Sequence, residues 1–403
     1  MVMRMKIYCN ILVVLLFIAG CTTSSSEKHS GMPLTVPLTK GNNPILLSNI
    51  VDSLHYIQLE TTDECVIGTI KKLYSIGDKL IIFDRDITKS IYFFNKDGTF
   101  INKISRIGRG PGEYVSITDI AIMAENEEII IWDSRARKLF IYDFDGTFIY
   151  DINFPYYGRS IEYIGNDFLA VYCDYSINQA LINGKTSPNL VIFNLKSRET
   201  KSDLFFDSNI NTQGITIINN NLSFFRGQLL LLPTLCNSIY SISNMGKEEK
   251  YYLDFGMPFE EKISDYIKNL SNVSVHNIQS AEENSNLPFI INILSSDRMI
   301  FLVYFLGNTY YYGFYYPDSN TYIESSSVVQ ENSPLVLVKN DIDNTIPFMP
   351  IAADVENNLY IVLNPFILLE EFKDSENANI QNLIRNSFPD DNPIIIKAFM
   401  KTL

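Results

Sequence analysis

The segment from Lys79 to Gly146 contains the same pattern twice. Each copy has an apolar run that ends in aspartate, a polar turn, a second apolar run and an Asp-Gly turn. The Asp97-Gly98 turn of the first copy returns 48 residues later as Asp145-Gly146. Short apolar runs joined by Asp-Gly are typical of β-hairpins. A repeat of about 40–50 residues built from short strands indicates a β-propeller with one four-stranded antiparallel sheet per blade.

The repeat predicts an all-β, six-bladed propeller. The predicted blades span residues 67–107, 114–155, 159–206, 216–255, 289–329 and 347–400. The last blade has three strands before the chain ends, so we predict that Leu54–Leu59 supplies the fourth by pairing with Ile394–Phe399. This closure would remove two free sheet edges. Two inserts, 258–288 and 365–389, carry apolar residues at helical spacing and predict short helices.

The N-terminus reads as a targeting segment. Arg4 and Lys6 precede the apolar run Ile11–Ala19, which is too short to span a membrane comfortably. The run ends in Phe17–Cys21, which matches a bacterial lipobox, so we expect cleavage before Cys21 and lipid on its sulfur; the alternative is an ordinary secretory signal that ends in cysteine. We therefore predict a lipoprotein signal peptide at 1–20, a flexible tether at 21–43 and the propeller at 44–403.

Composition excludes several classes of function. The net charge of −14 argues against nucleic acid as a partner, because phosphate neutralisation needs basic patches. Histidine and cysteine are sparse and scattered in the mature chain, so we expect no metal, no cofactor and no disulfide framework. The residues concerned are His29, His55, His276, Cys65, Cys173 and Cys236. We expect a monomer.

A glycine-rich loop, residues 108–112, follows the first Asp-Gly hairpin and leads into Glu113-Tyr114. Together with Leu59–Asp63 and Asp391–Pro393, this segment resembles the six-bladed β-propeller lipoproteins related to NHL-repeat proteins. The resemblance is strongest over residues 54–155 and the last fifteen residues. It implies a six-bladed fold and a place in the bacterial cell envelope. We favour the outer membrane over the inner, with the domain periplasmic or surface-exposed, although Thr22 and Thr23 after the lipidated cysteine do not decide between the two membranes. It implies no particular chemistry.

In a propeller, one face carries the loops between successive blades together with the loops between the second and third strands of each blade. This face and the central channel usually hold the site, and we expect both helical inserts to rim it. The predicted ligand-binding residues are Arg85, Arg106, Arg109, Glu113, Tyr114, Asp133, Arg135, Arg137, Asp174 and Tyr175.

Several of these residues have a structural alternative. The glycine-rich loop lacks the Lys-Ser/Thr of a phosphate-binding loop, which favours a structural turn between blades. Arg106 and Arg109 could clamp an anion or pair with Glu113 or a carboxylate of a neighbouring blade, and we favour pairing. Asp84 and Asp133 hold the same position in two repeats, which favours turn capping by their carboxylates.

The leading hypothesis is a lipid-anchored envelope protein that binds or scaffolds a glycan, a peptide or a protein partner, and we favour this role over an enzymatic one. The alternative is a hydrolase or lyase that acts on an extracellular polymer in the channel. An enzyme should bring acidic or Tyr/Arg groups together at one point of the channel with shifted pKa values. A third interpretation, a purely structural subunit of an outer-membrane complex, predicts a large exposed apolar patch.

Overall fold

The computed structural model describes residues 29–39, 43–208, 220–270, 287–328, 337–344 and 348–401, without the side chains of 267–270. The predicted signal peptide, Cys21 and His276 lie outside these ranges.

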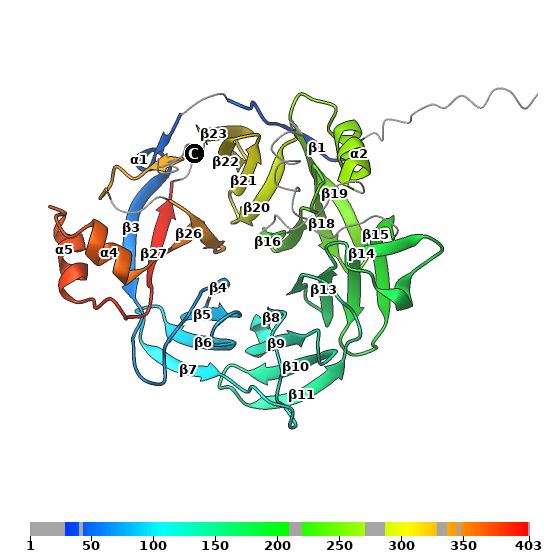
Figure 1. The fold of residues 1–403 in the computed structure, drawn as a ribbon, viewed down its shortest axis with the longest axis horizontal. Coiled ribbons are helices and arrows are strands. Elements are labelled where there is room, and N and C mark those ends of the chain that lie inside the picture. Colours follow the sequence, from blue (N-terminus) through cyan, green and yellow to red (C-terminus); the bar gives the residue numbers. More distant parts are fainter. Residues whose placement is uncertain are drawn as a thin grey trace, which may run out of the picture.

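Six sheets stand around a central opening in chain order, which confirms the predicted six-bladed propeller (Figure 1). The first blade contains β4 (Lys72–Ile76), β5 (Lys79–Asp84), β6 (Ser90–Asn95) and β7 (Phe100–Ile104). The second contains β8 (Asp119–Met123), β9 (Glu128–Asp133), β10 (Lys138–Asp143) and β11 (Phe148–Asn153), with the 3-10 turn η1 (Ala124–Asn126). The third contains β12 (Ser160–Tyr163), β13 (Phe168–Tyr172), β14 (Thr186–Asn194) and β15 (Thr200–Asp207), with η2 (Gln179–Leu181).

The other three blades follow the same plan. The fourth contains β16 (Leu222–Phe225), β17 (Gln228–Leu231), β18 (Ser238–Ser243) and β19 (Gly246–Asp254). The fifth contains β20 (Phe289–Ser295), β21 (Ile300–Leu306), β22 (Thr309–Tyr316) and β23 (Thr321–Val328). The sixth contains β25 (Pro350–Ala353), β26 (Asn358–Leu363), β27 (Ile394–Met400) and β3 (Val51–Gln58). In each blade the first strand named is the innermost one.

The core is divided into layers between neighbouring blades. Along β5, Ile81 and Phe83 pack against the second blade, whereas Leu80 and Ile82 pack against the sixth. Successive residues of a strand point to opposite faces of its sheet, so a strand that is apolar on both faces can be buried only between two other sheets. The described residues form six such buried clusters, one for each pair of neighbouring blades.

The ring closes as predicted. Strand β3 is antiparallel to β27, with Ile57 opposite Ile395 and Tyr56 opposite Ile396. The N-terminal strand therefore completes the sixth blade, and the closure joins the two ends of the propeller without leaving either blade edge open.

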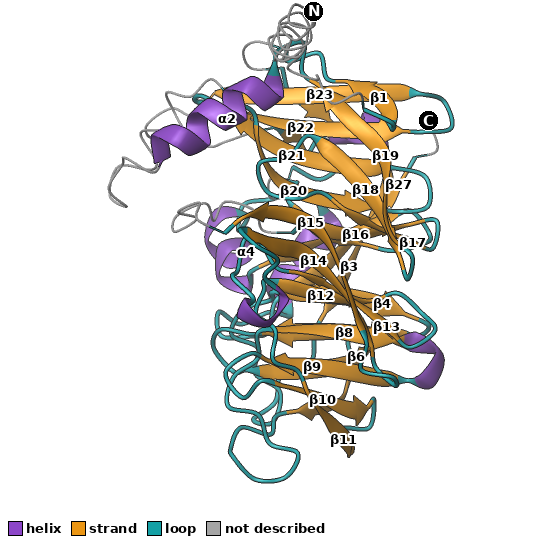
Figure 2. Cartoon of the chain, turned by 90° about the vertical axis from the view of Figure 1, so that its right-hand side faces the viewer, coloured by secondary structure: helices purple, strands orange, loops and turns teal. Residues whose placement is uncertain are grey.

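Both inserts contain helices, as expected. Helix α2 (Phe259–Leu270) follows the fourth blade, and α4 (Pro365–Glu371) and α5 (Ala378–Arg385) lie between β26 and β27. Figure 2 shows α2 and α4 on the same side of the ring as the loops between blades. We call this side the loop face and the opposite side the turn face.

The predicted flexible tether is wrong for the described residues between 29 and 43. Strand β1 (Met32–Thr35) pairs in parallel with β19 and adds a fifth strand to the fourth blade. The chain then passes the fifth blade, where Asn43 bridges to Ser326, and β2 (Ile45–Leu46) pairs with β24 (Val338–Lys339) before α1 (Leu47–Ile50) leads into β3. We call residues 29–39 and 43–46 the N-terminal strap, whose path along the rim is blue in Figure 1.

The strap is held by buried apolar side chains and by two carboxylates. Leu34 and Val36 are buried in the layer between the fourth and fifth blades. Glu324 accepts hydrogen bonds from the backbone N–H of Thr39 at 2.8 Å and from its hydroxyl at 3.1 Å. The strap has a polar composition, but it packs on the propeller because Leu34 and Val36, two residues apart in an extended chain, face the same side.

The second carboxylate, Glu249, forms a clasp at the start of the strap. Its oxygens accept hydrogen bonds from the backbone N–H groups of Ser30 (2.6 Å) and Gly31 (3.1 Å). His29 contacts Glu249 through Nδ1 at 2.8 Å and Glu260 through Nε2 at 3.0 Å. The His29 ring also stacks on Tyr252 with its centroid 4.2 Å away.

The clasp should make attachment of the strap depend on pH. Burial opposes the charged form of His29, but hydrogen bonds to Glu249 and Glu260 raise its pKa above 6.5. Protonated His29 therefore stabilises the attached strap fully below pH 6.5, and this stabilisation is lost as pH rises through the raised pKa. Burial likewise opposes ionisation of Glu249, but hydrogen bonds from Ser238, His29 and the strap backbone lower its pKa to about 2. That contribution is lost as pH falls from 4.5 toward 2.

We therefore expect hydrogen-exchange protection of the Leu34 and Val36 amides, after correction for intrinsic exchange, to be higher at about pH 6 than at about pH 8. The variant His29→Gln should show no such difference between the two pH values. An equal pH dependence in this variant would show that another group controls the strap.

Candidate functional site

The innermost strands of three successive blades meet at a polar cluster beside the channel. The Lys72 Nζ atom donates to Oδ2 of Asp119 at 2.8 Å and to Oε1 of Glu162 at 3.0 Å. The Tyr74 hydroxyl donates to the same Glu162 oxygen at 3.1 Å. We call Lys72, Tyr74, Asp119 and Glu162 the channel cluster. Figure 1 shows β4 and β8, which carry three of these residues, beside the central opening.

The surroundings of the channel cluster shift its pKa values. Asp119 is 3% exposed and Glu162 is 7% exposed. Burial would lower the pKa of Lys72, but Asp119 and Glu162 raise it well above its usual range. Burial raises the pKa of Glu162, with a further rise from Asp119 that Lys72 opposes. Burial and the Glu162 charge raise the pKa of the Tyr74 hydroxyl well above its usual range.

The channel cluster is closed on itself. Asp119 also accepts the backbone N–H of Ile161 at 2.8 Å, and the Lys72 ammonium and Tyr74 hydroxyl both reach the carbonyl of Ile120 at 3.3 Å. Such pairing ties the first three blades together at the axis. None of the four residues was predicted from the sequence, although Lys72 and Asp119 are 47 residues apart, close to the repeat length, at the start of two innermost strands.

Asp84 and Asp133 cap turns, as the repeat favoured. Asp133 is fully buried, and its carboxylate accepts the N–H groups of Val115 and Ser116 from one loop and of Arg135 and Ala136 from the other. Asp84 accepts the N–H groups of Gly68, Thr69, Ile87 and Thr88 in the same way. Each aspartate therefore joins the two loops of its blade on the loop face, and Asp133 is not presented to a ligand.

The glycine-rich loop, residues 108–112, is a structural turn between blades, which is the interpretation that its sequence favoured. It packs against the second blade, where the Tyr142 hydroxyl on β10 donates to the Gly112 carbonyl. Gly112 has φ +72°, and a Cβ there would lie 2.7 Å from the Phe148 ring. The loop needs glycine both for this close approach and for the left-handed backbone.

The loop also removes Tyr114 and Glu113 from the set of plausible ligand contacts. Tyr114 is buried and donates its hydroxyl to the carbonyl of Lys89 at 2.9 Å, and burial raises its pKa. Glu113 accepts the N–H of Gly110 at 2.7 Å. The favoured pairing of Glu113 with Arg106 or Arg109 does not occur, since the carboxylate serves its own loop.

Five arginines of the predicted set remain at the surface. Arg106, Arg109 and Arg135 are exposed, and within the described residues none of the three forms an ion pair. Arg137 is exposed and donates through Nη2 to the Tyr157 hydroxyl at 2.8 Å. Arg85 pairs with the adjacent Asp86 at 2.8 Å.

Asp174 and Tyr175 lie in the third blade and serve its contact with the fourth. Asp174 accepts hydrogen bonds from the hydroxyls of Tyr172 (3.0 Å) and Thr234 (2.7 Å) and pairs with Arg159 at 3.2 Å. The Tyr175 hydroxyl donates to the Thr234 carbonyl at 3.0 Å, and burial raises its pKa. The structure thus separates the predicted set into buried loop anchors and exposed arginines.

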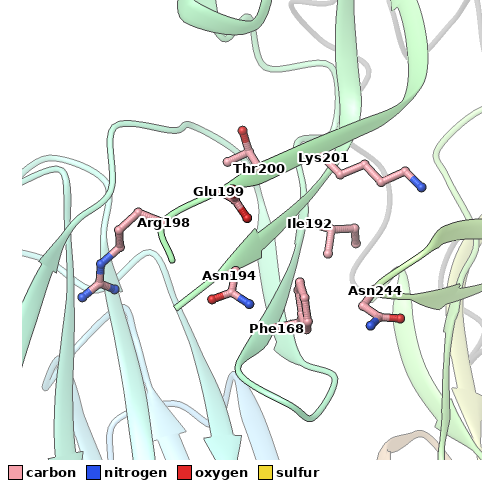
Figure 3. A pocket seen from close by; sticks show the side chains of 8 residues that line it. All are labelled: Phe168, Ile192, Asn194, Arg198, Glu199, Thr200, Lys201 and Asn244. Atoms are coloured by element: carbon pink, nitrogen blue, oxygen red, sulfur yellow. The ribbon is translucent and has the colours of Figure 1, made fainter. Parts of the chain in front are cut away.

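A separate groove of about 470 Å³ lies on the turn face between the third and fourth blades. Its lining comprises Phe168, Ile192, Asn194, Arg198, Glu199, Thr200, Lys201 and Asn244 (Figure 3). In Figure 3 the Arg198 side chain extends away from Phe168, and the Lys201 ammonium bonds the Met245 carbonyl across the gap. The groove is open and polar, and it shares no residue with the predicted site.

The described residues hold no group of three His, Cys, Asp or Glu side chains placed to bind a metal ion. In the same ranges, helices of the length and apolarity needed to cross a membrane are absent. Cys65, Cys173 and Cys236 are free thiols.

The fold and the loops that anchor it define this protein as a six-bladed β-propeller with a loop face and a closed polar cluster at the axis. The chain belongs to the family described as "Domain of unknown function (DUF4934)", whose model matches residues 33–399. No curated protein sequence matches the chain.

Several solved structures are similar to this chain. A putative exported protein from Bacteroides fragilis NCTC 9343 is 15% identical with a TM-score of 0.72, over 92% of this chain and 100% of that one. A member of the duf4221 family from Bacteroides vulgatus is 10% identical with a TM-score of 0.48, over 87% of this chain and 97% of that one. A luciferin-regenerating enzyme is 10% identical with a TM-score of 0.40, over 87% and 98%.

Proposed function

We propose that this protein is a lipid-anchored propeller of the bacterial envelope that binds or scaffolds a glycan, peptide or protein partner through its loop face. The observation that carries the proposal is the exposure of Arg106, Arg109, Arg135 and Arg137 in loops of the first and second blades. On a chain with a net charge of −14, a local group of exposed cations favours an acidic partner. Guanidinium groups also suit bidentate contact with carboxylates and phosphates.

The anchor belongs to the same proposal. The sequence Phe17–Cys21 supports lipid attachment at Cys21, and kinship with the NHL-related lipoproteins remains a prediction. The strap begins at His29, which is eight residues after Cys21 (29 − 21). Eight residues span at most about 29 Å when fully extended. A lipid at Cys21 would therefore keep the rim of the fourth blade close to the membrane.

The second candidate function is a hydrolase or lyase that acts on an extracellular polymer. The channel cluster favours it, because two carboxylates, a phenol and an ammonium converge beside the channel, and the pKa values of Lys72, Tyr74 and Glu162 are shifted. However, the groups satisfy one another and are largely buried, which suits a structural role better than proton transfer to a substrate. Turnover of an envelope polymer that is abolished by Glu162→Gln, without loss of folding, would favour the enzyme.

We expect the soluble domain to bind acidic members of a glycan and peptide array, and Arg109→Ala and Arg135→Ala each to weaken that binding by about fivefold or more. Lys247→Ala is the matched control, because Lys247 is an exposed cation near the turn face of the fourth blade. If both arginine variants bind like the wild type, the loop face of the first two blades is not the binding surface.

A further inference from the structure

The groove on the turn face lies where the fourth blade lacks a buried apolar side chain. In the second and third blades, the residue directly after the third strand is apolar and buried: Phe144 is 6% exposed and Leu195 is 4% exposed. Phe144 fills the gap toward the first blade, where its ring lies 5.5 Å from that of Phe93. The fourth blade has the exposed Asn244 at this position. The layer between the third and fourth blades is therefore open at the turn face.

The floor of the groove comes from one face of the third blade. Phe168 on β13 is opposite Asn194 on β14, and Ile192 on β14 is opposite Lys201 on β15. Opposite residues of neighbouring strands point to the same side of a sheet, as do residues two apart in one strand, so all four face the fourth blade. Phe168 and Ile192 belong to the apolar cluster between the two blades, but Phe168 stays partly exposed.

Two amide side chains flank the exposed edge of this floor. The side-chain carbonyl of Asn194 accepts the backbone N–H groups of Lys196 at 2.9 Å and of Ser197 at 2.8 Å. These bonds fix the amide, and its NH₂ group is turned toward the groove as a hydrogen-bond donor. In Figure 3 the Phe168 ring lies between the amides of Asn194 and Asn244. The groove therefore presents an apolar ring with polar groups on two sides.

The charges in the lining favour a neutral ligand. The Lys201 ammonium donates to the Met245 carbonyl, and the Arg198 guanidinium donates to the Leu195 carbonyl. Both cations thus have backbone partners, whereas the Glu199 carboxylate is exposed in the same lining. An anionic ligand would be repelled by Glu199, but a ligand hydroxyl could donate to it.

We propose that the groove binds a neutral glycan, with the C–H face of one hexopyranose ring on Phe168 and its hydroxyls on Asn194 and Asn244. A pyranose has an apolar face and a rim of hydroxyls, which matches an aromatic ring between two amides. The groove volume of about 470 Å³ suits such a ligand. This site lies on the face opposite the exposed arginines and is independent of the loop-face proposal.

The test is saturation-transfer NMR on the chain without residues 1–21, with cellotriose, mannotriose and galactotriose as neutral sugars and tri-alanine as a neutral peptide. We expect at least one of the sugars to receive saturation at its C–H protons, and tri-alanine to receive none. Asn244→Leu places an apolar side chain where the second and third blades have one, so it should fill the groove and abolish the signal. Asn244→Ala should weaken binding about fivefold, which corresponds to one hydrogen bond.

The matched control is Lys96→Leu. Lys96 directly follows the third strand of the first blade and donates its N–H to the Asp78 carbonyl, as Phe144 does to the Glu127 carbonyl, but it does not line the groove. This variant should bind the sugar like the wild type. Asn244→Leu should unfold at the same or a higher urea concentration than the wild type, because its new side chain covers the partly exposed Phe168.

Each outcome bears on the groove or on the ligand class. Equal saturation of a sugar by the wild type and by Asn244→Leu overturns the groove as the site. Saturation of tri-alanine in preference to the sugars overturns the glycan class. If none of the three sugars is saturated, the proposal is wrong, whereas binding of acidic array members that Arg109→Ala weakens would still support the loop-face proposal.

Discussion

Replacing Lys72 by methionine is expected to lower the free energy of unfolding by about 3–5 kcal/mol, because removal of one partner leaves buried charges uncompensated. Lys72 is the only cation that contacts Asp119 and Glu162 among the described ion pairs. Without it, two carboxylates remain close together and away from water. Urea unfolding monitored by the intrinsic fluorescence of the folded domain measures the loss.

The same variant should show a change in pH dependence. Without Lys72, burial and repulsion from Asp119 hold the pKa of Glu162 above its unfolded value. Groups of this kind favour the folded state when protonated, so the deficit should shrink as pH falls and grow as pH rises. The triple variant Lys72→Met/Asp119→Asn/Glu162→Gln should recover part of the lost stability, since it removes the uncompensated charges together.

The matched control is Lys79→Met, in which the lysine pairs with Asp78 at the surface. Exposed ion pairs contribute little, so this variant should unfold close to the wild type. An equal loss in Lys72→Met and Lys79→Met would mean that the channel cluster does not hold the first three blades together.

Asp133→Asn is expected to lower the free energy of unfolding by about 3 kcal/mol. Hydrogen bonds to a buried charge are strong, and their buried donors are costly to leave unpaired. The Asp133 oxygens accept from four backbone N–H groups and from the Ser116 hydroxyl, at 2.7–3.0 Å. An asparagine keeps the shape but turns an NH₂ group toward donors. Faster hydrogen exchange at Val115 and Ser116 should accompany the lower urea midpoint.

Asp84→Asn should behave in the same way, since Asp84 makes the equivalent contacts in the first blade. Asp145→Asn is the control, because Asp145 is exposed in the hairpin turn of the second blade. If Asp133→Asn unfolds at the same urea concentration as the wild type, Asp133 is again a possible ligand contact.

Much of the architecture is readable from the chain. The repeated hairpins around Asp97-Gly98 and Asp145-Gly146 predict six blades, and the missing last strand predicts the pairing of Leu54–Leu59 with Ile394–Phe399. These features are local or periodic, so one sequence contains them. The capping roles of Asp84 and Asp133 were readable for the same reason, because each aspartate recurs at the same point of its repeat.

The site was harder to predict, because its residues meet across blades. The ligand contacts predicted for the loop face included Tyr114 and Asp133, which tertiary packing buries. They did not include Lys72, Asp119 and Glu162, which only the ring brings together. The strap was missed because a polar composition concealed Leu34 and Val36, whose burial depends on a distant strand.

The sequence by itself determined the number of blades, their closure and the anchors of individual loops, since hydrophobic periodicity and turn chemistry act over a few residues. Only the tertiary structure decided which charges face one another at the axis and what the N-terminal segment does. Coulombic and hydrogen-bond energies depend on distances between residues that are 40 to 300 positions apart in the chain, for example 47 for Lys72–Asp119 and 285 for Thr39–Glu324.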